Sequence, residues 1–458
     1  MNINRDMFRE YDIRGVADQD LTIDAAFGIA KAFAKYAKER GYSEMFVGAD
    51  NRKSSPKLRE AVIDGLTQSG VHVYDLGTVI TPLFYHACVT KGVGAGIMVT
   101  ASHNPPQYNG FKLFLGESTL YGDQIQVIAD MVEQNDFVSG RGSIESYDHK
   151  EEYFKDLLKR IGTTLPLQVG VDCGNGTASL FAPELLARAG AQVEPLYCDS
   201  DPNFPHHQPD PVKAENMQDL KKLVLDKNLD MGLGFDGDGD RLGVVDDKGN
   251  ILFGDVLMIL FWREILSKRD PRTVKAIVEV KCSEALVEEL KRMGAEVVMY
   301  RTGHSLIKAK MRELKSPFAG EMSGHMFFAD EYYGYDDALY SALRLLRLVK
   351  ESGKKLSELV NTIPVYHASP EIRLEFSDER KFQLVEFVKN YFRAKGYPLV
   401  DVDGVRVYIK SGWGLVRASN TGPEIIVRYE AKDPNDLEAI RQELEEALSA
   451  GGFKANLP

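Results

Sequence analysis

The sequence predicts an α/β protein in which three related mixed-sheet α/β domains and a C-terminal α+β domain surround a central cleft. Three observations support this prediction. A short apolar strand, a polar turn, a helix and a second strand recur three times along the 458 residues. Each copy then leads into a loop rich in polar residues, and the last part of the chain follows a different order.

The three copies of this unit share a glycine directly after the last helical residue. Their first strands span 46–50, 169–172 and 276–280, their helices end at Gly70, Gly190 and Gly294, and their second strands begin near 71, 192 and 296. Glycine is favoured there because the chain leaves a helix in a left-handed conformation. Short apolar strands that alternate with helices indicate βαβ units and a mostly parallel sheet, with ligands beyond the strand ends.

The C-terminal part reads as strand, helix, several strands and helix, which is an α+β order. The helix after Ser377 places Leu384, Val388 and Phe392 on one face, and the last helix begins with Asp433 as its cap. We therefore expect four domains, with residue boundaries at 1–147, 148–252, 253–365 and 366–458.

Composition and charge exclude several functional classes. The chain has 56 Lys+Arg and 68 Asp+Glu, and its net charge of −12 disfavours nucleic acid and anionic membranes as partners. It has four cysteines without a CxxC pair, no apolar signal segment at the start, and no apolar run of about 18 residues. These features predict a soluble cytoplasmic protein and leave its oligomeric state open.

The first polar loop, Thr100–Pro105, follows an apolar strand and contains Ser102 and His103, with Lys112 further along. A hydroxyl in this setting is a candidate nucleophile or phosphoryl carrier. A turn-forming serine is the alternative. A hydrolase triad has little support because GxSxG is absent.

The second loop, Asp236–Arg241, carries carboxylates at alternate positions, at Asp236, Asp238 and Asp240. These charges repel one another unless a cation neutralises them, and hard oxygen ligands favour Mg²⁺ or Ca²⁺. An EF-hand is excluded because Arg241 and Asp247 stand where glycine and glutamate are needed. The compact site favours Mg²⁺, and a metal-free acidic turn is the remaining alternative.

Two further loops carry groups that can bind sugars and phosphates. In the third, Glu321, Ser323 and His325 can hydrogen-bond sugar hydroxyls, although an ordinary turn explains them as well. In the fourth, an arginine is followed by hydroxyl and amide side chains: Arg417, Ser419, Asn420 and Thr421. These groups can bind a phosphate, and a solvent-exposed turn is an equally good explanation.

Taken in order, these motifs resemble the α-D-phosphohexomutase family, and most closely its bacterial phosphomannomutase/phosphoglucomutase group. The resemblance spans nearly the whole chain. It runs through YDIRG (11–15), TASHNP (100–105), NGFK (109–112), DGDGDR (236–241), VKC (280–282), TGHS (302–305), GEMSGH (320–325) and RASNTGP (417–423).

The resemblance implies a role for each motif residue. Ser102 would carry the phosphate, and a phosphoserine oxygen would hold Mg²⁺ together with Asp236, Asp238 and Asp240. Glu321 and Ser323 would read sugar hydroxyls beside His325, while Arg417, Ser419, Asn420 and Thr421 would hold the phosphate that is not reacting. The reacting phosphate would be surrounded by Arg14, Lys112, Arg241, Lys281, His103 and His304, with Tyr11 contacting substrate. Lys112, His103, His304 and His325 are all candidates for the general base.

The implied reaction moves phosphate between O1 and O6 of mannose and glucose phosphates, through phosphoserine and a hexose 1,6-bisphosphate that also activates the enzyme. A phosphoglucosamine mutase is the close alternative, but Met322 stands where such enzymes carry a polar residue. A Mg-dependent sugar phosphatase and a non-catalytic sugar-phosphate binding protein are more distant alternatives. Gly422 and Glu424 depart from the group's pattern, and Glu424 is unfavourable beside a phosphate unless it points away.

Overall fold

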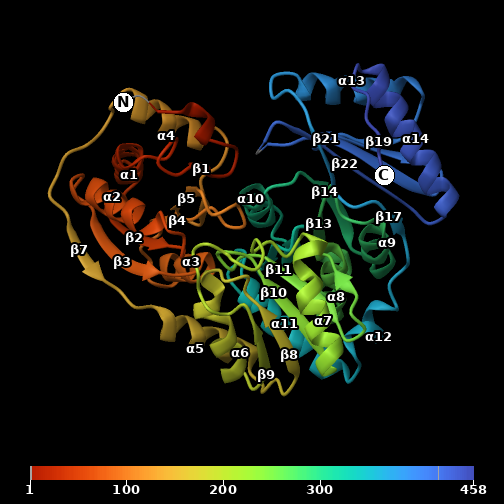
Figure 1. Cartoon of the computed structure of the whole chain (residues 1–458), viewed down its shortest axis with the longest axis horizontal. Coiled ribbons are helices and arrows are strands. Elements are labelled where there is room, and N and C mark those ends of the chain that lie inside the picture. Colours follow the sequence, from red (N-terminus) through yellow and green to blue (C-terminus); the bar gives the residue numbers. More distant parts are fainter. Residues whose placement is uncertain (1–2, 421) are drawn as a thin grey trace.

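A computed structural model describes residues 3–420 and 422–458, and it arranges them as four successive units (Figure 1). The first unit is built on a mixed sheet with strand order β1-β5-β4-β2-β3-β7, and β6 pairs with β5. Its elements are β1 (Ile13–Val16), α1 (Ile23–Lys38), β2 (Glu44–Ala49), α2 (Ser55–Thr67), β3 (His72–Thr78), α3 (Thr81–Thr90), β4 (Ala95–Val99), β5 (Tyr108–Leu115), β6 (Ser118–Thr119), α4 (Asp123–Glu133) and β7 (Ser143–Ser146).

Successive side chains of β2 are buried on opposite faces of this sheet. Met45 and Val47 are buried in a cluster with α1, α2 and α4, whereas Phe46 between them joins a second cluster that includes α3. Burial on both faces explains why the strand reads as a continuous apolar run.

The second unit has a five-stranded sheet in the order β12-β11-β10-β8-β9. Strand β8 is parallel to β9 and β10, while β10 and β11 are antiparallel. Its elements are α5 (Lys150–Ile161), β8 (Gln168–Asp172), α6 (Ala182–Arg188), β9 (Gln192–Leu196), α7 (Gln218–Lys227), β10 (Met231–Phe235), β11 (Leu242–Asp246) and β12 (Ile251–Leu252).

The third unit contains two separate strand pairs, the parallel pair β13/β14 and the antiparallel pair β15/β16. Its elements are α8 (Gly254–Ser267), β13 (Lys275–Glu279), α9 (Glu284–Met293), β14 (Glu296–Tyr300), α10 (His304–Leu314), β15 (Phe318–Gly320), β16 (Met326–Phe328), α11 (Ala338–Ser352) and α12 (Leu356–Val360).

The fourth unit is an antiparallel sheet, β17-β22-β21-β20-β19 with β18 on β22, packed against two helices. Its elements are β17 (His367–Ala368), β18 (Ile372–Glu375), α13 (Lys381–Ala394), β19 (Leu399–Val400), β20 (Val405–Ile409), β21 (Gly412–Ala418), β22 (Glu424–Ala431) and α14 (Pro434–Ala450). Short 3-10 helices span Arg5–Met7, Thr177–Leu180, Ala214–Met217 and Pro271–Thr273 elsewhere in the chain.

The structure confirms the predicted fold class of three α/β units and an α+β unit, with one correction. The expectation of mostly parallel sheets is wrong at the polar loops, because each of the first three loops joins two antiparallel strands: β4/β5, β10/β11 and β15/β16. A short loop reverses the chain, whereas a parallel neighbour needs a crossover of about a dozen residues. The predicted helix ends are confirmed, since Gly70, Gly190 and Gly294 all have positive φ.

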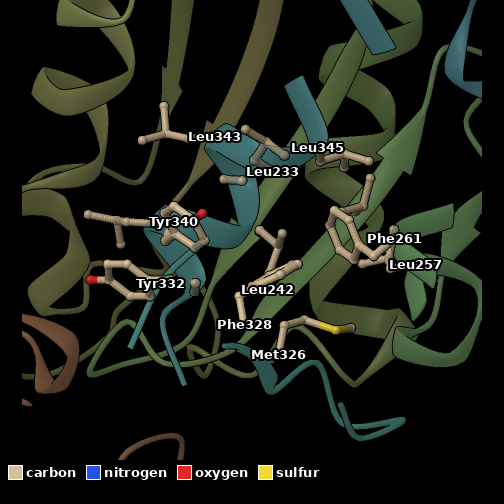
Figure 2. Close-up of a cluster of buried hydrophobic side chains, with 14 of the residues drawn as sticks. Leu233, Leu242, Leu257, Phe261, Met326, Phe328, Tyr332, Tyr340, Leu343 and Leu345 are labelled. Atoms are coloured by element: carbon tan, nitrogen blue, oxygen red, sulfur yellow. The ribbon is translucent and has the colours of Figure 1, made fainter. Parts of the chain in front are cut away.

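A continuous apolar core holds the first three units together. In Figure 2, Leu233 of β10 and Leu242 of β11 lie near Phe261 of α8, Phe328 of β16 and Tyr340 of α11, so the second and third units share buried side chains. The fourth unit has its own core. Among the helices of residues 3–420 and 422–458, none is long and apolar enough to cross a membrane.

Candidate active site

Ser102 lies in a strained and buried position at the end of β4. It has a φ of 50°, which costs free energy for a residue with a β-carbon, and its amide donates to Thr100 Oγ1 at 2.9 Å. Its hydroxyl donates to Asp236 Oδ2 at 2.6 Å and is 3.1 Å from His103 Nδ1. The loop therefore presents the Ser102 oxygen directly to the acidic loop of the second unit.

Arg52, which the sequence analysis did not select, fixes the backbone of this loop by hydrogen bonds. Its side chain is fully buried, and its two terminal nitrogens donate to the backbone oxygens of Ser102, Asn104, Pro105 and Tyr108. Its Nε donates to Asp50 Oδ2 at 3.1 Å. The burial is compensated because every donor has a partner, which makes Arg52 a positioning residue for Ser102.

The three carboxylates of the second loop are completely buried and converge. One oxygen from each of Asp236, Asp238 and Asp240 lies within 4.8 Å of the others. Burial and the charges of Asp240 and Asp238 raise the pKa of Asp236 well above its usual value. Burial also opposes ionisation of Asp238, but the Lys112 ammonium, at 2.8 Å, lowers the pKa of that carboxyl below its usual value.

This set of residues fits a hard divalent cation. Asp238 Oδ1 and Asp240 Oδ1 are buried without a hydrogen-bond partner among the residues that the structure describes, so each keeps a lone pair for a ligand. The backbone also approaches closely: a β-carbon at Gly237 would lie 2.3 Å from the Ser102 carbonyl oxygen. Only glycine allows the two loops to meet in this way.

His325 connects the acidic loop to the third unit. Its Nδ1 lies 3.1 Å from Asp336 Oδ2, and Arg241 Nε donates to its Nε2 at 2.9 Å. Lys308 Nζ donates to the other Asp336 oxygen at 2.7 Å, and the His304 ring stacks on His325 at 5.5 Å. Burial and the Lys308 charge hold the pKa of His304 well below its usual value.

The third polar loop, Gly320–His325, is held in place by Glu321. Its buried carboxylate accepts a hydrogen bond from the Gly303 amide at 2.7 Å, and Ser323 Oγ approaches its other oxygen at 3.4 Å. This contact brings the TGHS and GEMSGH segments together in the third unit.

The fourth loop meets the first and third units through Tyr11. Asn420 Nδ2 donates to the Tyr11 hydroxyl at 2.7 Å, and that hydroxyl donates to the Thr302 carbonyl at the same distance. Arg417 binds Asp403 at 3.0 Å, and Asp403 also accepts from the Thr302 amide at 3.0 Å. One tyrosine thus lies where three units meet.

Models of a known family match the four units in order. They are described as phosphoglucomutase/phosphomannomutase alpha/beta/alpha domain I, matching residues 5–139, domain II, matching 151–249, domain III, matching 253–366, and the C-terminal domain, matching 371–447. The chain belongs to the phosphoglucomutase/phosphomannomutase family. This confirms the resemblance read from the motifs.

Individual family members agree with this relationship. A phosphomannomutase/phosphoglucomutase from Pseudomonas aeruginosa is 42% identical over 444 residues, covering 97% of this chain and 96% of that protein. A phosphoglucomutase from Neisseria gonorrhoeae is 39% identical over 453 residues, covering 98% of each. The crystal structure of a family protein from Burkholderia thailandensis superposes with a TM-score of 0.93 at 39% identity, covering 100% of each chain.

The remaining predicted residues of this phosphoglucomutase/phosphomannomutase family member also lie at the loops. Arg14 Nη1 donates to Asn104 Oδ1 at 2.7 Å, and Lys281 Nζ binds Glu371 at 2.8 Å. Ser419 Oγ accepts from the Gly422 amide at 3.2 Å. The predicted residue Thr421 lies outside the described residues.

The carboxylate of Glu424, a departure from the family pattern, lies beside Gly422 of the fourth loop, since a β-carbon at Gly422 would lie 3.6 Å from its Oε2. This carboxylate accepts a hydrogen bond from Arg373 Nη1 at 2.9 Å, and the Glu424 backbone carbonyl accepts from the Ser419 amide. The unfavourable charge expected from the sequence is therefore neutralised at the edge of the sheet.

The sequence analysis missed several charged residues that orient the motif residues. They are single polar side chains outside any motif, and only the three-dimensional contacts identify them: Asp50, Arg52, Asp336, Glu371, Lys381 and Asp403. Lys381, for example, donates to the carbonyl oxygens of Ser419 and Gly422 and so shapes the fourth loop.

Proposed function

We propose that this chain is a phosphohexomutase that moves phosphate between O1 and O6 of mannose and glucose phosphates. The observation that carries the proposal is the 2.6 Å hydrogen bond from the buried Ser102 hydroxyl to Asp236, within a family of phosphoglucomutases and phosphomannomutases. A binding protein has no need for a strained, buried hydroxyl beside three carboxylates.

The metal ligands would be Ser102, Asp236, Asp238 and Asp240, with Mg²⁺ as the cation. The open lone pairs on Asp238 and Asp240 support this assignment. When bound, the ion neutralises charge on the phosphoryl group.

The first half-reaction begins with phosphate on Ser102. A sugar hydroxyl oxygen attacks the phosphorus, the bond from phosphorus to Ser102 Oγ breaks, and the hydroxyl proton passes to a base. Lys112, His103, His304 and His325 are the candidate bases for this proton. Arg14, Arg241 and Lys112 would supply the fixed positive charge around the transferring group.

The second half-reaction needs the resulting hexose 1,6-bisphosphate to turn over. Ser102 Oγ then attacks the phosphorus of the other phosphate, and the bond from that phosphorus to the sugar oxygen breaks. The freed sugar oxygen takes the proton that the base received in the first half-reaction, so the product leaves with phosphate on the opposite oxygen. During both steps Arg417, Ser419 and Asn420 would hold the phosphate that is not reacting, with Thr421 completing the loop. Glu321 and Ser323 would hydrogen-bond the sugar hydroxyls in either orientation.

In this scheme each of the four proposed domains provides one of the four polar loops. The proposed boundaries are 1–147, 148–252, 253–365 and 366–458. The proposal also gives His103, His304 and Lys281 contacts to the reacting phosphate. His325 would lie beside Glu321 and Ser323, and Tyr11 would contact the substrate. The names of the relatives do not favour a phosphoglucosamine mutase or a phosphatase. Consistent with that, Met322 is a buried apolar side chain.

A coupled assay tests the proposal. Mannose 1-phosphate, glucose 1-phosphate and glucosamine 1-phosphate are supplied separately, with and without Mg²⁺ and a hexose 1,6-bisphosphate primer, and released inorganic phosphate is measured beside isomer formation. We expect isomerisation of the mannose and glucose esters only. Stoichiometric phosphate release would replace the mutase with a phosphatase, and inactivity on all three esters would overturn the assignment.

A serine pair provides the matched control for the same assay. Ser102→Ala should abolish isomerisation. Ser267→Ala, which removes an exposed hydroxyl that donates to the Glu264 carbonyl of its own helix, should leave isomerisation unchanged. Retained turnover in Ser102→Ala would remove the proposed phosphoryl carrier.

A further inference from the structure

A cavity of about 760 Å³ lies between the first and third units, and none of the residues of the four polar loops lines it. It is bordered by the region around α3 and β4 on one side and by α10 and the segment after β16 on the other. The two sides are joined where Thr119 of β6 hydrogen-bonds Ser305 of α10, which lies beside the first unit in Figure 1. Its volume is in the range of sites for small organic ligands, about 300–1,000 Å³.

The lining of this cavity is strongly positive, although the whole chain carries a net charge of −12. It contains four cationic side chains and one carboxylate: Arg269, Lys308, Arg312, Lys315 and Glu117. Within residues 3–420 and 422–458, Arg269 and Lys315 form neither an ion pair nor a side-chain hydrogen bond. Arg312 donates to the Glu117 carbonyl oxygen at 3.1 Å and lies 3.8 Å from its carboxylate, while Lys308 donates to Asp336 Oδ1 at 2.7 Å. The charges of the exposed Arg269 and Lys315 side chains therefore favour an anionic ligand.

Aromatic rings line the same cavity. Tyr42 and Tyr333 are both partly exposed there, and Tyr335 lies nearly parallel to Tyr333, with interplanar angle 6°. Tyr42 is fixed against the backbone, because a β-carbon at Gly94 would lie 2.8 Å from its ring. Tyr333 also contacts the Arg160 guanidinium, at 4.4 Å from its ring centroid, and Tyr335 is buried, so Tyr42 and the exposed edge of Tyr333 offer the apolar surface for a planar group.

From these observations we infer that the cavity binds a nucleoside diphosphate. The phosphates would contact Arg269, Arg312 and Lys315, and the base would lie against the tyrosine rings. Inorganic phosphate would satisfy the charges but leave the ring surface uncovered. The combination of charge, flat apolar surface and volume therefore favours the larger ligand.

Lys308 connects this cavity to the candidate active site. It lines the cavity, and its Nζ donates to Asp336 Oδ1 at 2.7 Å. The other Asp336 oxygen is 3.1 Å from His325 Nδ1. An anion bound near Lys308 would compete with Asp336 for this ammonium, so occupancy should alter kcat as well as the binding equilibrium.

Titration calorimetry on the full chain tests the inference, with GDP, ADP, UDP and inorganic phosphate as separate probes. Saturating glucose 1-phosphate is present to occupy the candidate active site. The double variant R269E/K315E reverses the two unpaired charges of the cavity. The variant R141E/K222E reverses two exposed charges elsewhere, on the loop before β7 and on α7, and serves as the matched control.

We expect saturable binding of at least one nucleoside diphosphate, weakened about a hundredfold in R269E/K315E, since each charge-assisted contact is worth about tenfold in affinity. R141E/K222E should bind like the unaltered chain, and both variants should keep the basal isomerisation rate. Absence of nucleotide binding, an equal loss in the control, binding that R269E/K315E does not weaken, or equally tight binding of inorganic phosphate alone would each overturn the inference.

Discussion

Replacing Arg52 by lysine tests whether the conformation of the Ser102 loop depends on the hydrogen bonds that Arg52 donates to its backbone. The guanidinium donates five hydrogen bonds, one from Nε to Asp50 and four from its terminal nitrogens to the backbone oxygens of Ser102, Asn104, Pro105 and Tyr108. An ammonium has only three donors, so at least two of these buried acceptors lose their partner.

The expected cost follows from that count. Each buried acceptor left unpaired costs about 1–3 kcal/mol, so two of them cost roughly 2–6 kcal/mol. If the chain relieves this cost by moving the loop, a penalty of about 3 kcal/mol reduces the population of the productive loop about a hundredfold. Arg52→Lys should therefore lower kcat about a hundredfold and change KM for the sugar phosphate little, because the five hydrogen bonds of Arg52 go to Asp50 and to the Ser102–Tyr108 segment.

Steady-state kinetics of Arg52→Lys beside Arg59→Lys gives the measurement. Arg59 is a partly exposed arginine of the same unit, at 3.6 Å from Asp75, and its replacement should leave kcat within about twofold. Circular dichroism and the urea midpoint show whether the variants remain folded. An unchanged kcat in a folded Arg52→Lys protein would refute the proposed support.

Three further predictions concern the metal, the contact between units and pH. Asp240→Asn removes one carboxylate, so it should raise the Mg²⁺ concentration needed for half-maximal rate at least about tenfold, as measured by activity against added Mg²⁺. Tyr11→Phe deletes the hydroxyl that bonds Thr302 and Asn420, two hydrogen bonds worth about 1 kcal/mol each, and should raise KM about tenfold or more; an unchanged KM would contradict the role of Tyr11. Burial lowers the pKa of His86 to about 4, so as pH falls the unfolded chain protonates this residue before the folded chain does. The free energy of unfolding should therefore decline by up to about 3 kcal/mol between about pH 6.5 and pH 4. Urea midpoints measured over this range should decline less in His86→Gln.

Much of the fold could be predicted because it depends on local patterns. The apolar strands and the glycines after the helices are set by alternating burial and by backbone conformation, and the structure reproduces them at Gly70, Gly190 and Gly294. The parallel character of the sheets was predicted wrongly beside the polar loops. The repeated strand–helix–strand pattern predicts parallel neighbours. However, β5, β11 and β16 each follow a short loop that reverses the chain, so each of them pairs antiparallel with the strand before it.

The site shows the same division between local pattern and long-range contact. Asp236, Asp238 and Asp240 are recognisable because their spacing is unusual, and the structure brings them together with Ser102. Asp336 gives no such signal, since it stands beside another aspartate in a tyrosine-rich segment. Its role becomes visible only when folding places it between Lys308 and the His325 ring.

The central claim is that Ser102 carries phosphate between two positions of a hexose. The most direct measurement is intact-mass and peptide mass spectrometry of the protein after incubation with glucose 1,6-bisphosphate and Mg²⁺. The account predicts a mass gain of one phosphoryl group, located on Ser102, which disappears when excess glucose 6-phosphate is added and does not form in Ser102→Ala. A phosphate located on any other residue, or turnover without phosphorylated Ser102, would contradict it.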